Sequence, residues 1–174
     1  MTEPSLASTH WRLTGALPAS LDEKPRGLEP RRWLTYHHAM TRPLLLVAAA
    51  ALVDRDNRVL VARRPQGKVM AGLWEFPGGK VGPDETPEEA LVRELAEELG
   101  IEVCLTCLAP FTFASHAYDT FHLLMPLYLC RTWEGEISPR EGQEIAWVRA
   151  ARLAHLDMPP ADLPLLPMLR DLLG

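Results

Sequence analysis

A glycine-rich segment that runs directly into a glutamate-rich helix constrains this chain more than any other feature. Three glutamates, Glu94, Glu97 and Glu98, have the spacing i, i+3 and i+4. That spacing places their carboxylates on one face of a helix, where like charges repel one another. A hard divalent cation such as Mg²⁺ or Mn²⁺, which prefers oxygen ligands, reverses the sign of that interaction. The cluster therefore predicts a metal site.

The helix that carries these glutamates is marked at both ends. Thr86 and Glu89 match a capping box, with a proline at the first helical position between them. Gly100 is placed to end the helix. Three leucines repeat every four residues and form an apolar stripe that we expect to face inward: Leu91, Leu95 and Leu99. The alternative for an arbitrary glutamate set of this spacing is a solvated amphipathic helix.

The residues around this helix extend a longer pattern. Five residues separate Gly79 from Glu85, and seven more lead to the run Arg93-Glu94-Leu95-Ala96-Glu97-Glu98-Leu99-Gly100-Ile101. This pattern resembles a complete Nudix box, the motif of the Nudix hydrolase family. Other segments have the order and spacing of MutT-like members: Arg63-Arg64, Leu73 to Gly79, Glu141-Gly142-Gln143 and Pro159 to Pro164. The resemblance covers about residues 43 to 174 and implies an α/β Nudix fold, with a mixed β-sheet sandwiched between helices (α/β/α).

Length and composition agree with one catalytic domain. A chain of 174 residues with 47% hydrophobic content predicts one domain with its own core. We expect residues 43–174 to form this domain. Residues 1–42 hold scattered prolines without sustained periodicity, which predicts a flexible or loosely docked extension, and Met40 could be the natural start.

Charge and cysteine content limit the partners and the compartment. A formal net charge of −5 argues against direct nucleic-acid binding. The longest apolar run, Leu44 to Val53, is too short to span a membrane. An odd count of three cysteines favours a reducing cytoplasm, and we expect Cys104 and Cys107 to be buried thiols on opposite sides of a strand over residues 101–108. We therefore expect a cytoplasmic enzyme. Its oligomeric state is compatible with either a monomer or a dimer.

Turn residues and apolar runs indicate the remaining elements. Residues 43–53 read as a buried strand, with residues 58–64 as its hairpin partner across a turn. Further strands are expected near residues 101–117, 121–131 and 144–149, and helices over residues 151–156 and 163–173.

The resemblance implies the activity and the metal ligands. The expected reaction is Mg²⁺-dependent hydrolysis of a nucleoside triphosphate to the monophosphate and pyrophosphate, in which Mn²⁺ can substitute. A cation neutralises the negative charge that repels an attacking water. The box glutamates are the expected ligands, with the Gly78 carbonyl and Glu141 added by resemblance. The proton acceptor stays open among Glu97, Glu98 and Glu141.

Other residues are assigned supporting or substrate-binding roles by the same resemblance. We expect Glu85 and Arg93 to form an ion pair that fixes the glycine loop to the helix. The expected substrate contacts come from Arg64 and Lys80 at the phosphates, Arg63 as the neighbouring alternative, Phe76 as an apolar wall, and Gly78 and Gly79 where the backbone approaches closely.

Asp162 carries the expectation about the base. It stands where MutT-like proteins usually have an asparagine, and an ionised carboxylate only accepts hydrogen bonds. It repels the N7 and O6 acceptors of guanine but pairs with the N7–H of 8-oxoguanine or the N4 amino group of cytosine. We therefore favour 8-oxo-dGTP, in nucleotide-pool sanitation that avoids replication errors, with CTP or dCTP as the alternative. A helix N-cap is the structural alternative for Asp162.

Two other functions fit the resemblance less well. One is hydrolysis of dinucleoside polyphosphates or nucleotide sugars, which uses the same box. The other is a non-catalytic Nudix-like binding module, which would have a degenerate box.

Overall fold

A four-stranded mixed sheet forms the centre of the computed structural model, which describes residues 42–174. The expectation of an extension over residues 1–42 falls, except for Arg42, outside the described residues. The strand order is β4-β1-β6-β5, with β1 parallel to β6 and the other neighbours antiparallel. The four strands are β1 (Leu44–Leu52), β4 (Gly78–Lys80), β5 (Ala109–Ala117) and β6 (His122–Cys130).

A second, three-stranded antiparallel sheet corrects the expected hairpin. Its order is β3-β2-β7, with bounds Trp74–Glu75, Arg58–Arg63 and Glu144–Arg149. The prediction that β2 pairs along β1 is wrong, because only the isolated bridge Val53–Val59 joins their ends. Both edges of β1 are already occupied, by β4 and β6, so β2 turns away and pairs with β7 along its whole length.

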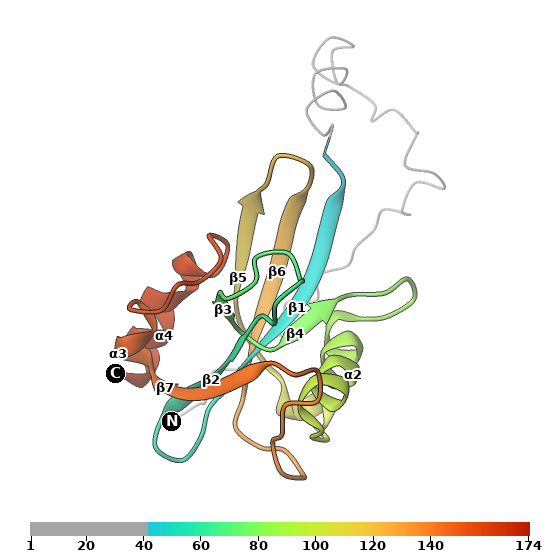
Figure 1. Cartoon of the computed structure of the whole chain (residues 1–174). Coiled ribbons are helices and arrows are strands. Elements are labelled where there is room, and N and C mark those ends of the chain that lie inside the picture. Colours follow the sequence, from blue (N-terminus) through green and yellow to red (C-terminus); the bar gives the residue numbers. More distant parts are fainter. Residues whose placement is uncertain (1–41) are drawn as a thin grey trace, which may run out of the picture. The chain divides into compact units, whose positions relative to one another are not determined.

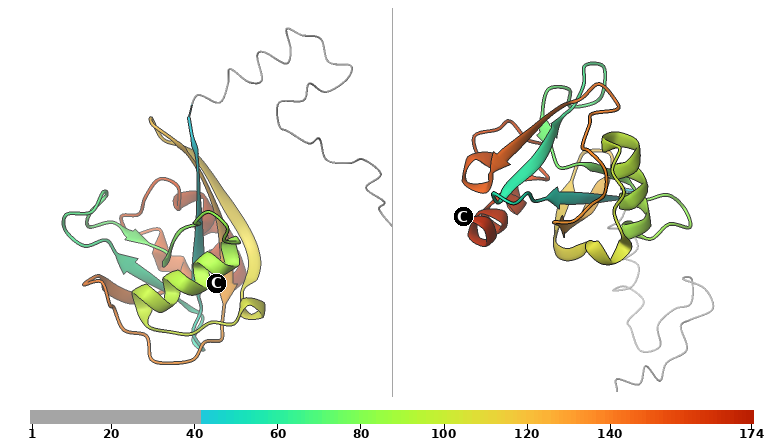
Figure 2. Two further views of the ribbon diagram at one scale, coloured as in Figure 1. Left: turned by 90° about the vertical axis from the view of Figure 1, so that its right-hand side faces the viewer. Right: turned by 90° about the horizontal axis from the view of Figure 1, so that it is seen from below.

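Helices cover both sides of these sheets, which confirms the α/β/α class. Figures 1 and 2 show α2 (Pro87–Leu99) on one side and α3 (Ala150–Leu153) with α4 (Leu166–Leu173) on the other. The expected helix over residues 151–156 is shorter, as α3 (Ala150–Leu153). The expected final helix starts with a 3₁₀ turn, η2 (Leu163–Leu165), and continues as α4 (Leu166–Leu173).

The second half of β1, from Ala48 onward, is buried on both faces and joins two apolar cores. Ala49, Ala51 and Val53 belong to the core under α4, whereas alternate residues Ala48 and Ala50 belong to the core under α2. This explains why β1 reads as a continuous apolar run. The three leucines predicted to anchor α2 are fully buried in the second core, each contributing roughly 1.5–3 kcal/mol: Leu91, Leu95 and Leu99.

The segment after α2 differs from the expected strand of buried thiols. Cys104 and Cys107 flank and end a 3₁₀ turn, η1 (Leu105–Cys107), and form a disulfide; Cys104 is exposed. The strand begins only at Ala109. The bond between these two cysteines removes the support that an odd count of free thiols gave to a reducing compartment. None of the helices between residues 42 and 174 is long and apolar enough to cross a membrane.

Candidate active site

Arg93 connects the glycine-rich loop to α2, as predicted. Its Nε donates to Glu85 Oε1 at 2.8 Å and its Nη2 donates to Glu85 Oε2 at 3.0 Å. Nη2 also reaches the Lys80 carbonyl oxygen at 3.2 Å. This two-pronged geometry suits a guanidinium and a carboxylate. It lowers the pKa of Glu85 to about 2, mainly through the Arg93 hydrogen bonds and the Gly82 N–H.

The start and end of α2 are formed as the sequence predicts. Thr86 Oγ1 accepts from the Glu89 N–H, and the Glu89 carboxylate accepts from the Thr86 N–H, which completes the capping box. Gly100 takes the left-handed conformation, with φ 72°. These caps fix where the helix begins and therefore where its glutamates point.

Two glycines let β4 lie directly against β1 and α2. Gly78 has φ 145°, and a Cβ there would lie 2.1 Å from the Ala48 carbonyl oxygen. A Cβ on Gly79 would lie 2.2 Å from Glu94 Cδ. Both distances are shorter than any tolerated contact, so side chains at these positions would displace the strand or the Glu94 carboxylate.

Like-charged carboxylates repel, and each of the four predicted carboxylate ligands lies against a hydrogen-bond donor. Glu94 and Glu97 bind Arg93 Nη1 at 2.9 and 3.4 Å. Glu98 Oε2 accepts from the Gly78 N–H at 3.3 Å. Glu141 forms an ion pair with Lys68.

Glu98 is the most perturbed of these acids. Its burial raises its pKa to about 7, assisted by the negative charges of Glu94, Glu141 and Glu75, whereas the Gly78 N–H acts in the opposite direction. Glu98 and Glu141 line a cavity beside the helix. Glu94 and Glu97 are not among the described residues that line it, and Glu97 is exposed. The cluster predicted on one helical face therefore divides between two environments.

The donor set of this site can be compared with what a hard divalent cation needs. Carboxylate oxygens suit a hard cation. Burial is the main cause of the raised pKa of Glu98, and the neighbouring carboxylates that add to it make a charge excess that a cation relieves. As placed, however, no group of three His, Cys, Asp or Glu side chains within residues 42–174 converges on one point. The residues fit a cation by donor type and charge, and their side chains would have to turn toward it.

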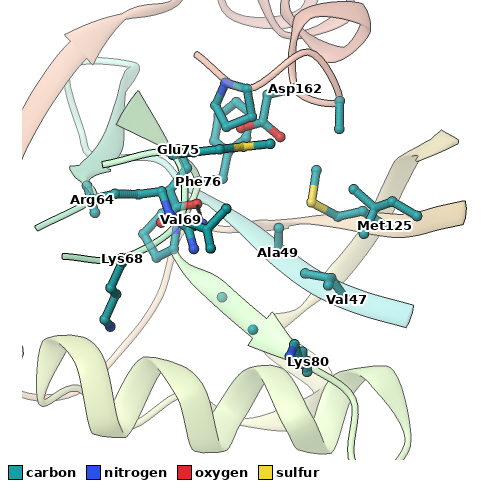
Figure 3. Close-up of a pocket in the computed structure, with 18 of the residues that line it drawn as sticks. Val47, Ala49, Arg64, Lys68, Val69, Glu75, Phe76, Lys80, Met125 and Asp162 are labelled. Atoms are coloured by element: carbon teal, nitrogen blue, oxygen red, sulfur yellow. Dashed lines mark hydrogen bonds and ion pairs between the residues drawn. The ribbon is translucent and has the colours of Figure 1, made fainter. Parts of the chain in front are cut away.

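A cavity of about 420 Å³ lies between the two sheets and the loop before η2. Figure 3 shows Asp162 on one side of it, and Lys68 and Lys80 on the side of α2. Arg64 and Glu75 face each other inside it and form an ion pair. Its apolar lining includes Val47, Ala49, Phe76, Tyr118, Phe121 and Met125.

Asp162 is 4% exposed and lines this cavity. It occupies the N-cap position of η2, as the structural alternative predicts, but its side chain makes no capping hydrogen bond, so the cap does not use the carboxyl group. Burial raises its pKa to about 7; the Glu75 carboxylate raises it further and Arg64 acts in the opposite direction. The carboxyl group is thus buried toward the cavity without a structural partner in the described part of the chain.

Arginine, lysine and aromatic candidates occupy distinct parts of the cavity. Arg63 and Arg64 both border it, but Arg63 Nε binds the Gly72 carbonyl oxygen at 3.0 Å and its Nη1 lies 3.4 Å from exposed Glu144. Arg64 is therefore the arginine directed inward. Lys80 borders the cavity and is exposed, and Phe76 is buried in its wall.

Three residues near these groups were not singled out as site residues from the sequence. Glu75 pairs with Arg64, Lys68 pairs with Glu141, and Gln143 binds the backbone of both Glu98 and Glu141. Glu75 and Gln143 stand in segments that resemble MutT-like proteins, which is a signal of importance but not of role. Lys68 lies in a loop whose sequence gives no signal.

Comparison with known proteins decides the family. A NUDIX domain model matches residues 48–168. The chain belongs to the NUDIX family. It is 37% identical over 117 residues to the 8-oxo-dGTP diphosphatase of Proteus vulgaris. That match covers 67% of this chain and 96% of the relative.

Two further similar proteins are a CTP pyrophosphohydrolase and a MutT protein of known structure. This NUDIX chain is 38% identical over 124 residues to the CTP pyrophosphohydrolase of Escherichia coli, covering 70% of this chain and 89% of the relative. A solved MutT structure, from work on Aliivibrio salmonicida and Vibrio cholerae, superposes with a TM-score of 0.64 at 33% identity. That match covers 74% of this chain and 98% of the MutT chain. The predicted NUDIX membership, MutT-like fold and hydrolase class are confirmed.

Proposed function

We propose that this NUDIX enzyme hydrolyses 8-oxo-dGTP to the monophosphate and pyrophosphate, with Mg²⁺ as the cofactor, and so removes an oxidised nucleotide from the precursor pool. The nucleotide pool is cytoplasmic, and we place the enzyme there. The similarity to 8-oxo-dGTP diphosphatases supports the reaction. The observation that carries the substrate is the buried carboxyl group of Asp162, which lines the cavity without a structural hydrogen bond in the described residues.

The Asp162 side chain makes no capping hydrogen bond and lines the cavity, so its carboxyl group is available to a hydrogen-bond donor on a bound base. An ionised Asp162 accepts the N7–H that oxidation at C8 creates and repels the N7 of unmodified guanine. Phe76 and Tyr118 supply apolar and aromatic surface for a base in the same cavity. The base end of the cavity thus has the polarity that 8-oxoguanine needs.

The other end of the cavity has the acids and cations for the polyphosphate. A bound divalent cation supplies charge neutralisation and makes an attacking water more acidic. Glu98 and Glu141 would hold it from inside the cavity, and Glu94 and Glu97 from the adjacent helix face, once their side chains turn toward it. One of Glu97, Glu98 and Glu141 accepts the proton from water. Arg64 and Lys80 donate to phosphate oxygens.

Hydrolysis of CTP or dCTP is the second candidate. Cytosine also presents a donor, at N4, to an ionised Asp162. The similarity to a CTP pyrophosphohydrolase is as high as that to the diphosphatase, at 38% identity. The two candidates share the phosphate chemistry and differ only in the base.

The test is a panel assay of the purified full chain with Mg²⁺. kcat/KM is measured for 8-oxo-dGTP, dGTP, CTP and 5-substituted dCTP, and the products are separated to establish release of pyrophosphate. We expect 8-oxo-dGTP to exceed dGTP by at least about 100-fold, since a site built for a donor rejects an acceptor strongly. A preference for CTP over 8-oxo-dGTP would transfer the proposal to the second candidate.

A matched pair of variants assigns the preference to Asp162. Asp162→Asn should change the ratio of 8-oxo-dGTP to dGTP by roughly tenfold or more, because an amide can both donate and accept. Asp171→Asn makes the same chemical change at an exposed position on α4 and should leave the ratio unchanged. Equal ratios in both variants would remove Asp162 from base recognition.

A further inference from the structure

Gln143 and Asp162 are the two polar side chains buried in the described part of the chain. Gln143 is 8% exposed and lies immediately before β7. A buried amide generally has hydrogen-bond partners at both its ends, because an unmade bond in the interior is costly. The partners of Gln143 therefore indicate what it orients.

The two ends of this amide bind the backbone of two acidic residues. Nε2 of Gln143 donates to the carbonyl oxygen of Glu98 at 2.8 Å. Oε1 of Gln143 accepts from the N–H of Glu141 at 2.8 Å. One buried side chain thus joins α2, which carries Glu98, to the loop that carries Glu141.

Other bonds hold this loop to the helix but do not reach Glu141. Arg140 N–H donates to the Glu98 carbonyl oxygen at 2.9 Å, and Ser138 N–H donates to the Leu99 carbonyl oxygen at 2.9 Å. The Glu141 side chain itself is held by an ion pair with Lys68, in which both side chains are more than 40% exposed. Exposed pairs of this kind contribute about 0–1 kcal/mol, so they fix a position weakly.

We propose that Gln143 is a positioning residue that sets the separation of Glu98 and Glu141, so that both carboxylates face the phosphate end of the same cavity. Both acids line that cavity, and their negative charges repel each other. Without the amide, the loop can carry Glu141 away from Glu98. This inference rests on the proposed function in taking the two acids as cation ligands.

The test compares Gln143→Met with Gln66→Met in the full chain. Methionine has a similar length and no hydrogen-bonding amide, and Gln66 is exposed and absent from the described lining of the cavity. Binding of Mn²⁺ to the nucleotide-free protein is measured by titration calorimetry, and kcat and KM are measured separately. Gln143→Asn, which keeps a buried amide one methylene shorter, serves if the methionine variant does not fold.

Partners that orient ligands are typically worth about 10- to 100-fold in metal affinity or activity. We expect a loss of this size in Mn²⁺ affinity and in kcat for Gln143→Met, with KM changed by less than about threefold, and no effect for Gln66→Met. Mn²⁺ affinity and kcat within about twofold of the wild type would overturn the assignment.

A double-mutant cycle separates positioning from general destabilisation. In a Glu141→Gln background, Gln143→Met should cost much less, because the group that it positions is already lost. Equal fold losses in both backgrounds would overturn the inference. If the wild type hydrolyses no nucleoside triphosphate, the proposed function fails, while the Mn²⁺ affinities still decide the role of Gln143.

Discussion

Arg64 and Glu75 form an ion pair inside the cavity, and this pair leaves the buried Nε of Arg64 without a partner in the described residues. Nη1 of Arg64 binds the Glu75 carboxylate, but Nε is buried and has no hydrogen bond within the described residues. It is the one such side-chain atom in this part of the chain. Glu75 therefore holds the guanidinium in place, while its Nε–H stays unsatisfied in the interior beside the cavity.

The first prediction concerns the effect of this pair on Asp162. The negative charge of Glu75 raises the pKa of Asp162, and the positive charge of Arg64 lowers it. Glu75→Gln removes the first effect and leaves Arg64 unneutralised, so both changes should lower the pKa of Asp162. Carboxyl ¹³C NMR titration of Asp162 measures this directly. Glu144→Gln, which removes the exposed partner of Arg63, is the control and should leave the midpoint unchanged.

The second prediction is a loss of stability with rising pH that originates at Asp162. Its folded pKa of about 7 lies above the ordinary value of 3.8. Between these two values the folded state keeps a proton that the unfolded state has released, so the free energy of unfolding falls as pH rises, and it levels off above pH 7. A tenfold difference in proton affinity between the folded and unfolded states corresponds to about 1.4 kcal/mol.

Urea unfolding at pH 5 and pH 8 measures this loss. Asp162→Asn cannot titrate, so we expect its stability to fall less than that of the wild type between these pH values. The exposed control Asp171→Asn should follow the wild type. Parallel curves for all three proteins would show that Asp162 ionises normally in the folded state.

The base preference should follow the same protonation. Below its pKa, Asp162 carries a proton that it can donate to the acceptor edge of unmodified guanine. We expect the ratio of kcat/KM for dGTP to kcat/KM for 8-oxo-dGTP to rise as pH falls below 7. Since the ratio cancels effects common to both substrates, a ratio that is flat from pH 6 to pH 8 would contradict this prediction.

Sequence reasoning succeeded where local chemistry sets the structure. The capping box of Thr86, the C-terminal glycine of α2 and the Arg93–Glu85 ion pair all depend on residues close in sequence. Such patterns specify geometry within one helix and the loop that precedes it. The buried leucine stripe of α2 follows from the same periodicity.

Prediction from the sequence failed where segments far apart in the chain compete for the same strand partner. Residues 58–63 look like the hairpin partner of β1, but β4 and β6 take both edges of β1. The pairings of Lys68 with Glu141 and of Gln143 with Glu98 join residues far apart in sequence. No spacing rule within one segment reports such contacts, so they emerged only from the fold.

The fourth prediction concerns Glu98, the more buried of the two predicted carboxylate ligands that line the cavity. Glu98→Gln removes a charge that burial and three neighbouring carboxylates oppose. We expect the melting temperature to stay level or rise, while kcat falls by about 10²–10⁴-fold and Mn²⁺ affinity decreases. Glu102→Gln, at an exposed position just after α2, is the matched control. Near-normal turnover of folded Glu98→Gln would reject the assignment of Glu98 to the reaction.

The final prediction is that Lys68 contributes to binding of the polyphosphate. Its ammonium lines the cavity on the side of α2, and its hydrogen bond to Glu141 raises its pKa, so it stays charged. When a triphosphate binds, its phosphate oxygens replace the Glu141 carboxylate as the hydrogen-bond acceptor of the Lys68 ammonium. Lys68→Met should raise KM about tenfold, the value of one hydrogen bond to a charged group, with a smaller effect on kcat. Lys68→Arg should retain most of the affinity, whereas Arg55→Met, which removes an exposed charge from the β1–β2 turn, should have no effect. If KM is unchanged in Lys68→Met, the ammonium serves Glu141 alone and does not bind substrate.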